Sequence, residues 1–315
     1  MKIKTPYYNW RQYTHGSISL CMIMRDAEKT LARCLDSVRG LVDEIILVDT
    51  GSRDRSVQIA LSHGAHVLHD PWQDDFARPR NIGIEKATGS WILILDPDEM
   101  ISQTDHAELK QLTNTVLYDA FWLTTRNYGP YTYRMDYKFV PKGGDPLGKY
   151  EGYVPSTKTR FFRNGHGIRF EGCWHELADW YIRRNKLRQG SSRVAVHHWT
   201  HEISQATGVE KKAFYLKMGE KKVREWPNHG QARWELATAE MTSGYRARAC
   251  RSLATAFRLG FNRSDSYYSI SKCQRLLGNK DIGDLAFEKG VCHQYPALTH
   301  IDPEKRPISK LLDTL

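Results

Sequence analysis

The 315-residue sequence has no unbroken apolar run near the roughly 20 residues that a membrane-spanning helix needs. Its longest apolar runs, such as residues 91–95 and 45–48, have only the length of a strand. The N-terminal segment from Met1 to His15 is basic and aromatic, and it lacks the apolar core and the cleavage site of a secretory signal. We therefore expect a cytoplasmic chain without a transmembrane segment.

Cysteine is also scarce, and its spacing excludes a common kind of metal site. The six cysteines, at positions 21, 34, 173, 250, 273 and 292, form no C-x-x-C pair and no zinc-like pattern. Reduced thiols in the cytosol are the simplest interpretation of such a set.

The charge of the chain is strongly positive, but its distribution points to no single partner. The formal net charge is +10, and the basic residues are spread along the whole chain. Such a charge suits nucleic acid, an anionic membrane face or small anionic substrates. No known nucleic-acid-binding motif is present, so a basic nucleic-acid-binding protein is a weak alternative.

Strands and helices alternate through the first hundred residues. Apolar runs of strand length occupy residues 18–24, 44–48, 66–69 and 91–95, and amphipathic helical patterns lie between them. Buried strands that alternate with helices predict an α/β fold with a mostly parallel, doubly wound, Rossmann-like sheet. Ligands of such sheets bind at the carboxyl ends of the strands.

Carboxylates are concentrated at that edge of the predicted sheet. Asp26 follows the first strand, Asp49 and Asp54 follow the second, and Asp96 and Asp98 follow the fourth. Each acid alone is more typical of a turn or a helix cap. Together they would repel one another unless a cation lay among them, and Mg²⁺ or Mn²⁺ takes oxygen ligands. The pattern predicts a nucleotide diphosphate bound with a divalent metal.

Two phosphate-binding loops that are common on α/β sheets are missing. Neither G-x-x-x-x-G-K-[ST] nor G-x-G-x-x-G follows the first strand. The metal and arginines must then meet the phosphate charge. Arg80 is one candidate, on a helix that we expect to start at residues 78–79 because proline at 79 is tolerated only in a first turn.

Two long segments resemble glycosyltransferase family 2, the inverting enzymes of the A-type fold. They read ISLCMIMRDAEKTLARCLDSVRGLVDEIILVDTGSRDRS and DDFARPRNIGIEKATGSWILILDPDE. The likeness continues more loosely through RFFRNGHGIRFEGCWHE and VAVHHWTH. The resemblance implies that Asp49 binds the base or ribose, whereas Asp96 and Asp98 form the D-x-D pair for metal and donor phosphates. The expected metal ligands are Asp96, Asp98 and His198, and the expected donor-binding residues are Arg25, Asp26, Asp49, Gly51, Ser52, Asp54, Arg80, Asn81 and Asp96.

Inversion at the anomeric carbon needs a base that takes the proton of the acceptor. The candidates are Glu171 in F-E-G, Glu176 in W-H-E, and His175 between them. Glu176 is the first choice by resemblance. His175 has the further alternatives of a metal ligand or a helix-start residue.

Beyond residue 205 the pattern becomes helical and repeats itself. When residues 231–264 are compared with residues 265–298, Leu236 pairs with Ile270 and Gly244 pairs with Gly278. This offset is the tetratricopeptide period. We predict a catalytic domain at residues 1–204 and a tetratricopeptide-like helical domain at 205–315. The helical domain is a cover for the catalytic domain, a groove for a peptide, or a surface for a homodimer.

The leading hypothesis is an inverting hexosyltransferase that uses a UDP-sugar with Mg²⁺ or Mn²⁺. The first-choice acceptor is a peptide or protein Ser or Cys side chain, because the chain carries a repeat tail and no membrane segment. The alternatives are an enzyme that builds a cell-surface glycan or lipopolysaccharide core, and a repeat scaffold with a dead transferase domain. The intact acids at 49, 96 and 98 argue against the dead domain.

Overall fold

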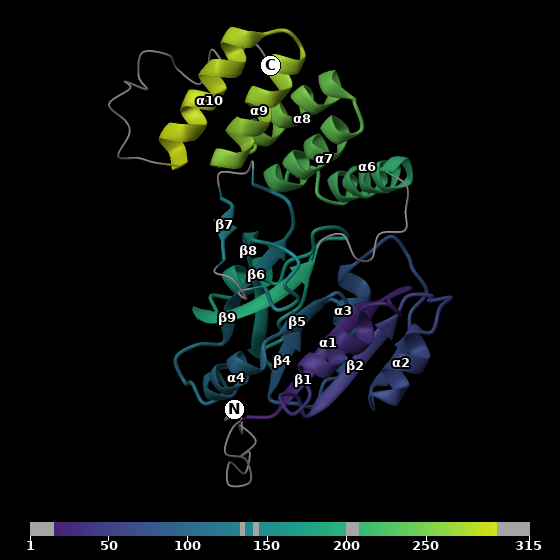
Figure 1. The fold of residues 1–315 in the computed structure, drawn as a ribbon. Helices are drawn as coiled ribbons and strands as arrows, with labels where there is room; N and C mark the ends of the chain where they lie inside the picture. Colours follow the sequence, from purple (N-terminus) through teal and green to yellow (C-terminus); the bar gives the residue numbers. More distant parts are fainter. Residues whose placement is uncertain (1–15, 133–135, 141–144, 200–207, 295–315) are drawn as a thin grey trace, which may run out of the picture. The chain divides into compact units, whose positions relative to one another are not determined.

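The computed structural model describes residues 16–132, 136–140, 145–199 and 208–294. The chain divides into two compact units, Met1–Ser204 and Gln205–Leu315 (Figure 1). Each unit has a hydrophobic core of its own. Within the described ranges, no helix combines the length and the apolar character needed to cross a membrane.

The first unit is built on one mixed sheet. Its strand order is β3-β2-β1-β4-β8-β6-β9-β5, and β7 pairs with β8. The strands are β1 (Ile18–Met24), β2 (Glu44–Asp49), β3 (His66–His69), β4 (Trp91–Ile94), β5 (Glu99–Ile101), β6 (Ala120–Tyr128), β7 (Lys138–Phe139), β8 (Gly152–Arg163) and β9 (Gln189–Trp199).

The first four strands form the predicted parallel half. β1 pairs in parallel with β2 and β4, and β2 pairs in parallel with β3. Every residue of β1 is buried, as expected for a strand covered on both faces. Met24 lies opposite Asp49 in the register, so β1 and β2 end at the same edge of the sheet. The α/β fold class is confirmed, and the strands expected at 18–24 and 66–69 have these bounds.

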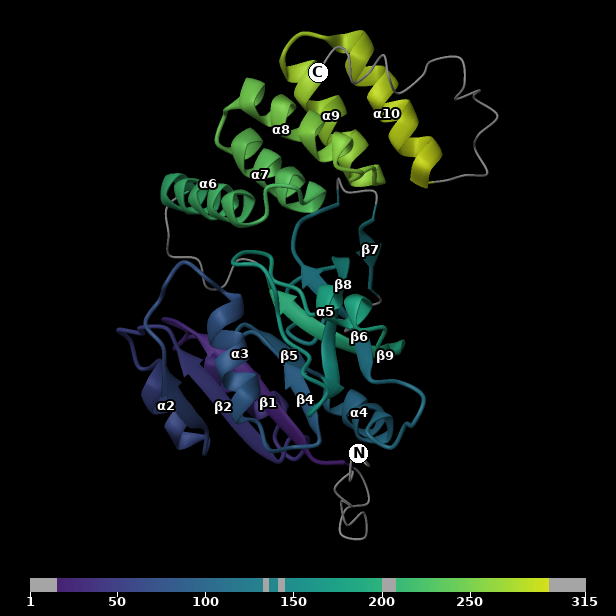
Figure 2. The same cartoon turned by 180° about the vertical axis from the view of Figure 1, so that it is seen from behind.

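Helices cover both faces of this sheet. On one face lie α1 (Leu31–Ser37), α2 (Ser56–Ser62), the short 3-10 turn η1 (Gln103–Asp105) and α4 (His106–Leu112). Figure 2 shows α3 (Ala77–Lys86) and α5 (Asp179–Arg184) over the other face. Two separate core clusters match this division: Leu31 and Leu35 of α1 belong to one, and Ile84 of α3 and Ile182 of α5 belong to the other. Helix α3 begins one residue before the predicted start, with Pro79 in its first turn.

The second half of the sheet is largely antiparallel. β8 runs antiparallel to β4 and places Phe161 opposite Leu93. β6 pairs with β8 in antiparallel and with β9 in parallel orientation, and β5 pairs with β9 in antiparallel orientation. This arrangement brings the ends of β4 and β9 near one another, because Glu99 in β5, just after the D-x-D pair, lies opposite His198.

The second unit consists of α6 (Gly208–Glu225), α7 (Gly230–Thr242), α8 (Arg246–Arg258), α9 (Ser264–Leu276) and α10 (Lys280–Gln294) (Figure 1). The start of α9 follows that of α7 by the tetratricopeptide period, and the start of α10 follows that of α8 by the same interval. Gly244 and Gly278 occupy the same turn in the two helix pairs, each at φ 87°. Such a left-handed conformation suits glycine, which has no Cβ to clash. The predicted helical repeat is therefore present.

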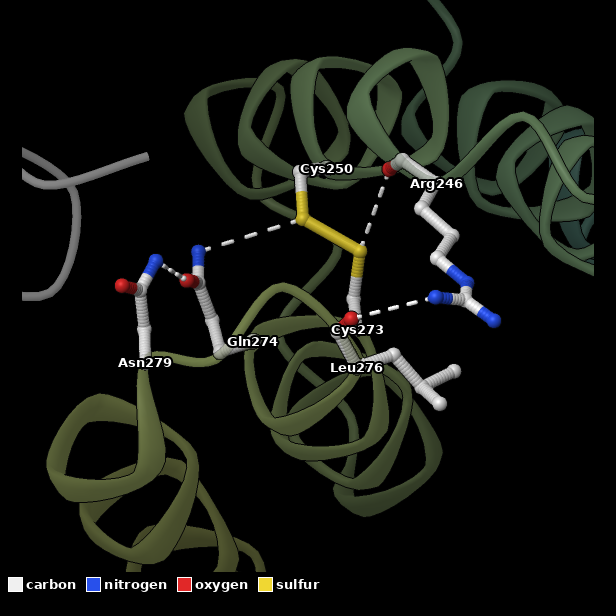
Figure 3. Close-up of a disulfide and its surroundings, with 6 residues drawn as sticks. All are labelled: Arg246, Cys250, Cys273, Gln274, Leu276 and Asn279. Carbon is white, nitrogen blue, oxygen red and sulfur yellow. Dashed lines mark hydrogen bonds between the residues drawn. A yellow bond between two sulfur atoms is a disulfide. The ribbon is translucent and has the colours of Figure 1, made fainter.

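A disulfide joins the two helix pairs. Figure 3 shows Cys250 of α8 bonded to Cys273 of α9. The pair lies in the core of the helical unit, where the Cys273 sulfur is 3.3 Å from the carbonyl oxygen of Arg246. The expectation that all thiols are reduced is thus wrong for this pair. Its 23-residue separation follows from the stacking of successive helices, which the sequence spacing did not reveal.

Candidate active site

Five side chains, most of them buried, form a cluster of alternating charge beside the carboxyl end of β4. This carboxylate–arginine cluster consists of Arg80, Asp96, Glu99, Arg160 and Glu176. Arg80 of α3 donates to Glu176 at 2.6 Å through Nε and to Asp96 at 2.7 Å through Nη2. Arg80 therefore connects the D-x-D pair to a candidate base.

Arg160 of β8 completes the cluster from the opposite side. Both of its terminal nitrogens donate to Glu99 at 2.7 Å, and Nη1 lies 3.9 Å from Asp96. Burial would raise the pKa of Asp96, but the charges of Arg80 and Arg160 outweigh it and hold that pKa well below its usual range. The pKa of Glu99 is raised by burial and by nearby acids, although Arg160 opposes this.

Removing Arg160 should destabilise the chain strongly, because Glu99 would stay buried without its bidentate partner. For Arg160→Met we expect the free energy of unfolding to fall by about 3–5 kcal/mol, measured by urea denaturation. The control is Arg39→Met, which removes an exposed pair with Asp36 and should cost less than about 1 kcal/mol. Equal losses in the two variants would contradict the importance of the buried pair.

The three candidate bases lie in the segment from Glu171 to Leu177, but their side chains have different surroundings. Backbone hydrogen bonds in both directions between Glu171 and Leu177 close it into a loop. The Glu171 carboxylate pairs with Arg184, while the Glu176 carboxylate faces the cleft and is 11% exposed. His175 is exposed at φ 47°, with its ring against Trp174. Among the three candidates, only Glu176 belongs to the carboxylate–arginine cluster, through its contact with Arg80.

A small cleft lies at this cluster. It has a volume of about 30 Å³, far below the roughly 300–1,000 Å³ of typical ligand pockets. Its lining includes Arg80, Asp96, Lys158, Arg160 and Glu176. Lys158 and Arg160 were not among the site residues predicted from the sequence. A signal in the sequence could have identified them: two cationic residues occupy alternate positions of a predicted strand that is otherwise partly apolar.

The second D-x-D acid pairs with a histidine of β9. His198 Nε2 lies 3.2 Å from the Asp98 carboxylate, and His198 Nδ1 lies 2.9 Å from Asn127 Oδ1. The Asn127 amide nitrogen donates to the carbonyl oxygen of Val154, so its oxygen is turned toward the histidine. Burial would lower the pKa of His198, but the hydrogen bond and charge of Asp98 outweigh it and the pKa is raised.

Asp98 and His198 supply a pair of ligand types that suits a divalent cation. The contact between His198 Nδ1 and Asn127 fixes the ring so that Nε2 is turned toward Asp98. Such a partner on the second ring nitrogen is the usual outer-shell support of a metal-binding histidine. Asp96, the third predicted ligand, is instead held by Arg80. In the described ranges no three His, Cys, Asp or Glu side chains are grouped to hold a metal ion.

The neighbouring His197 is buried on the other side of β9. Its Nδ1 lies 2.9 Å from the Tyr128 hydroxyl, and its ring stacks on Tyr128 with centroids 5.7 Å apart. Burial, followed by the charge of Arg126, lowers the pKa of His197 to about 4. This histidine therefore remains neutral in the folded chain at neutral pH.

This neutral histidine predicts a loss of stability in acid. Between pH 6.5 and 4 the unfolded chain protonates His197 while the folded chain does not, so the free energy of unfolding falls as the pH is lowered. The full contribution is about 3 kcal/mol. Urea denaturation from pH 7 to 4 should show a flatter profile for His197→Phe than for the unchanged chain. Identical slopes would contradict the assignment.

The other predicted donor-binding residues form a second group, in the loops after β1 and β2. Asp49 accepts the Ser52 backbone N–H at 3.0 Å, and Ser52 Oγ accepts the Asp26 backbone N–H at 3.0 Å. Gly51 adopts φ 111° between them. Arg25 lies 3.8 Å from the Asp26 carboxylate. These residues hold one another in a fixed loop arrangement at the edge where β1 and β2 end.

Two of the predicted donor-binding residues have evident structural partners. Asp54 accepts the backbone N–H groups of Glu28 and Ser56. Burial would raise its pKa, but the hydrogen bonds outweigh this and lower it. Asn81 uses both ends of its amide on the backbone of Phe170, at 2.8 and 2.9 Å. Asn81 thereby fixes the backbone immediately before Glu171.

Comparison with known proteins identifies the family to which the chain belongs. The model of the family described as glycosyl transferase family 2 matches residues 19–191. A TPR repeat-containing protein of Synechococcus elongatus is 40% identical over 165 residues, which make up 52% of this chain and 36% of that protein. The SPbeta prophage-derived glycosyltransferase SunS of Bacillus subtilis is 25% identical over 178 residues, or 56% of this chain and 38% of SunS. The alignments thus span little more than a third of these relatives.

Among solved structures, that of S. aureus TarS residues 1–349 is similar with a TM-score of 0.45 and 13% identity. The alignment covers 86% of this chain and 90% of that one.

Proposed function

The chain belongs to glycosyl transferase family 2, and from this premise we propose that it transfers a hexose from a UDP-sugar to an acceptor with inversion at the anomeric carbon. The observation that carries the proposal is at Arg80. Its Nη1 is buried and has no hydrogen-bond partner within the described part of the chain, although its other two nitrogens are paired. Such a donor calls for an acceptor oxygen, and a donor phosphate offers one.

Asp98 and His198 are the residues that would hold Mg²⁺ or Mn²⁺, with Asp96 beside them. When bound, the cation offsets the charge of the diphosphate as it leaves. Asp49 and its loop partners fit the nucleoside end, because they lie at the shared edge of β1 and β2 where ligands of such sheets bind. Lys158 adds a positive charge to the lining of the cleft.

Glu176 is the proposed base. In the transfer step, the acceptor oxygen or sulfur forms a bond to the anomeric carbon while the bond to the diphosphate breaks, and the acceptor proton passes to Glu176. Arg80 holds Oε1 of this carboxylate, which leaves Oε2 for the acceptor.

For the acceptor we propose a Ser or Cys side chain of a peptide or protein. The helical unit supports this choice, because stacked helix pairs create extended surfaces that suit peptides. A cell-surface glycan or lipopolysaccharide core is the alternative acceptor. A cytoplasmic location also stays a prediction, which cell fractionation would test. A homodimer formed through the helical unit is a further prediction, which sedimentation would test.

The test of the function is the release of UDP from a panel of UDP-sugars, with Mn²⁺ and with excess EDTA. We expect one sugar to be hydrolysed slowly with Mn²⁺ and none with EDTA. Mass spectrometry of peptide and glycan acceptors incubated with that donor then identifies the acceptor class. The proposal would be refuted if no donor released UDP and if the chain did not bind UDP.

A further inference from the structure

The helical unit contains a second, larger cleft, which is unrelated to the carboxylate–arginine cluster. Its volume is about 210 Å³, and it is open to solvent. The lining residues come from one helix pair: Arg233 and Glu240 from α7, and Arg248, Arg251, Ser252 and Thr255 from α8. The proposed transfer reaction uses none of them.

Two buried polar atoms in this cleft have no hydrogen-bond partner in the described ranges. One is Nε of Arg233, a donor, and the other is Oε2 of Glu240, an acceptor. The Glu240 residue is only 2% exposed. Its other oxygen accepts from Arg248 at 3.1 Å. Because buried polar groups are nearly always paired in folded proteins, these two atoms are hydrogen-bonding groups that a molecule bound in the cleft can satisfy.

The positions of these atoms specify what the ligand must carry. It needs an acceptor oxygen for Arg233 and an N–H or O–H donor for Glu240. Glu240 and Glu220 both pair with Arg248, so the three arginines of the cleft exceed the acids around it by one charge. The acceptor group is therefore favoured when it is an anion.

The size of the cleft favours one residue of a longer chain. A volume of 210 Å³ is below the roughly 300–1,000 Å³ of pockets that enclose a small molecule, and such pockets are mostly apolar. An aspartate or glutamate in a peptide combines a carboxylate with a backbone N–H a few ångströms away. Arginine clusters are a recurring means of recognising acidic segments.

We propose that this cleft binds an acidic side chain of a peptide, with its carboxylate at Arg233 and Arg251 and a neighbouring backbone N–H at Glu240. The site is formed by α7 and α8, next to Glu220 of α6. It is therefore separate from the surface on which α7 packs against α9. The proposal does not depend on the transferase activity.

The test is fluorescence polarisation of the full chain with a labelled Gly-Ser peptide that has two central aspartates. The same peptide with two asparagines should bind about 10-fold more weakly or not at all, because it lacks the charge-assisted hydrogen bonds. Arg251→Gln and Arg233→Gln should each weaken the aspartate peptide about 10-fold. Glu240→Met, which removes the acceptor for the N–H, should weaken the aspartate peptide.

The matched control is Arg258→Gln, an exposed arginine on α8 that does not line the cleft. It should leave binding unchanged. The proposal would be overturned if the two peptides bound equally well or if neither bound. It would also be overturned if Arg258→Gln weakened binding as much as Arg251→Gln does. Displacement of the aspartate peptide by an equal concentration of inorganic phosphate would also overturn it, since it would identify a site for small anions. Arg251 is exposed, so its variant remains informative if Arg233→Gln fails to fold.

Discussion

Replacing Glu176 by glutamine is expected to lower the turnover number by about 10²-fold or more, the effect of losing a general base. Glutamine has nearly the same shape, and its amide oxygen can still accept from Arg80. UDP binding should therefore change little. Steady-state UDP release in the presence of acceptor measures the turnover, and calorimetry measures the binding of UDP.

Glu171→Gln is the matched control, because that carboxylate faces Arg184 and belongs to the same loop. It should retain nearly full turnover. If Glu171→Gln lost activity and Glu176→Gln kept it, the base would be Glu171. Loss in neither variant would direct attention to His175 or to an acceptor that needs no base.

The pH dependence of the same variant distinguishes the two proposed acceptor atoms. A free thiol has a pKa of about 8.5 and supplies its own thiolate at higher pH, whereas a hydroxyl does not. With a Cys acceptor, the loss caused by Glu176→Gln should therefore shrink between pH 7 and 9. With a Ser acceptor it should stay constant.

Replacing Asp98 by asparagine is expected to reduce kcat/KM by about 10²-fold or more at saturating Mn²⁺, since Lewis-acid stabilisation contributes several kcal/mol. Asparagine keeps the size of the side chain but removes the charge that faces His198. Electron paramagnetic resonance of Mn²⁺ should show weaker binding to the variant. This readout does not depend on activity.

Asp36→Asn serves as the control for that experiment, because Asp36 is an exposed acid on α1 that pairs with Arg39. It should bind Mn²⁺ as the unchanged chain does. Normal Mn²⁺ binding and turnover in Asp98→Asn would refute the role of Asp98. Full activity of the unchanged chain in excess EDTA would refute the metal requirement itself.

The local patterns of the sequence were enough to predict most of the first half of the sheet. The apolar run at 18–24 became β1 without change, because a strand buried on both faces leaves a continuous signal. The short run at 66–69 also became β3 without change, although this edge strand is only partly buried. The repeat period likewise predicted that a second helical unit follows the first at the same interval. These features depend on residues that are close in sequence or spaced at a fixed period.

Side-chain partners brought together by long-range pairing were not predictable in the same way. Arg80 and Glu176 are 96 residues apart, and Arg160 and Glu99 are 61 apart, so no local pattern connects them. From its place after a strand, Asp49 is expected to be an exposed loop carboxylate, yet it is 4% exposed. Its burial follows from the Ser52 backbone and from the neighbouring strands, which a single sequence does not specify.

The disulfide between α8 and α9 bears on how the helical unit unfolds. In a stack of repeats, each pair is held mainly by its nearest neighbours, so an array can lose its end pair while the remainder stays folded. A covalent bond from the first pair to the second opposes that separation. Amide hydrogen exchange should therefore find one cooperative foldon from α7 to α9 in the oxidised chain. After reduction, α9 and α10 should become free to open before α7 and α8 do.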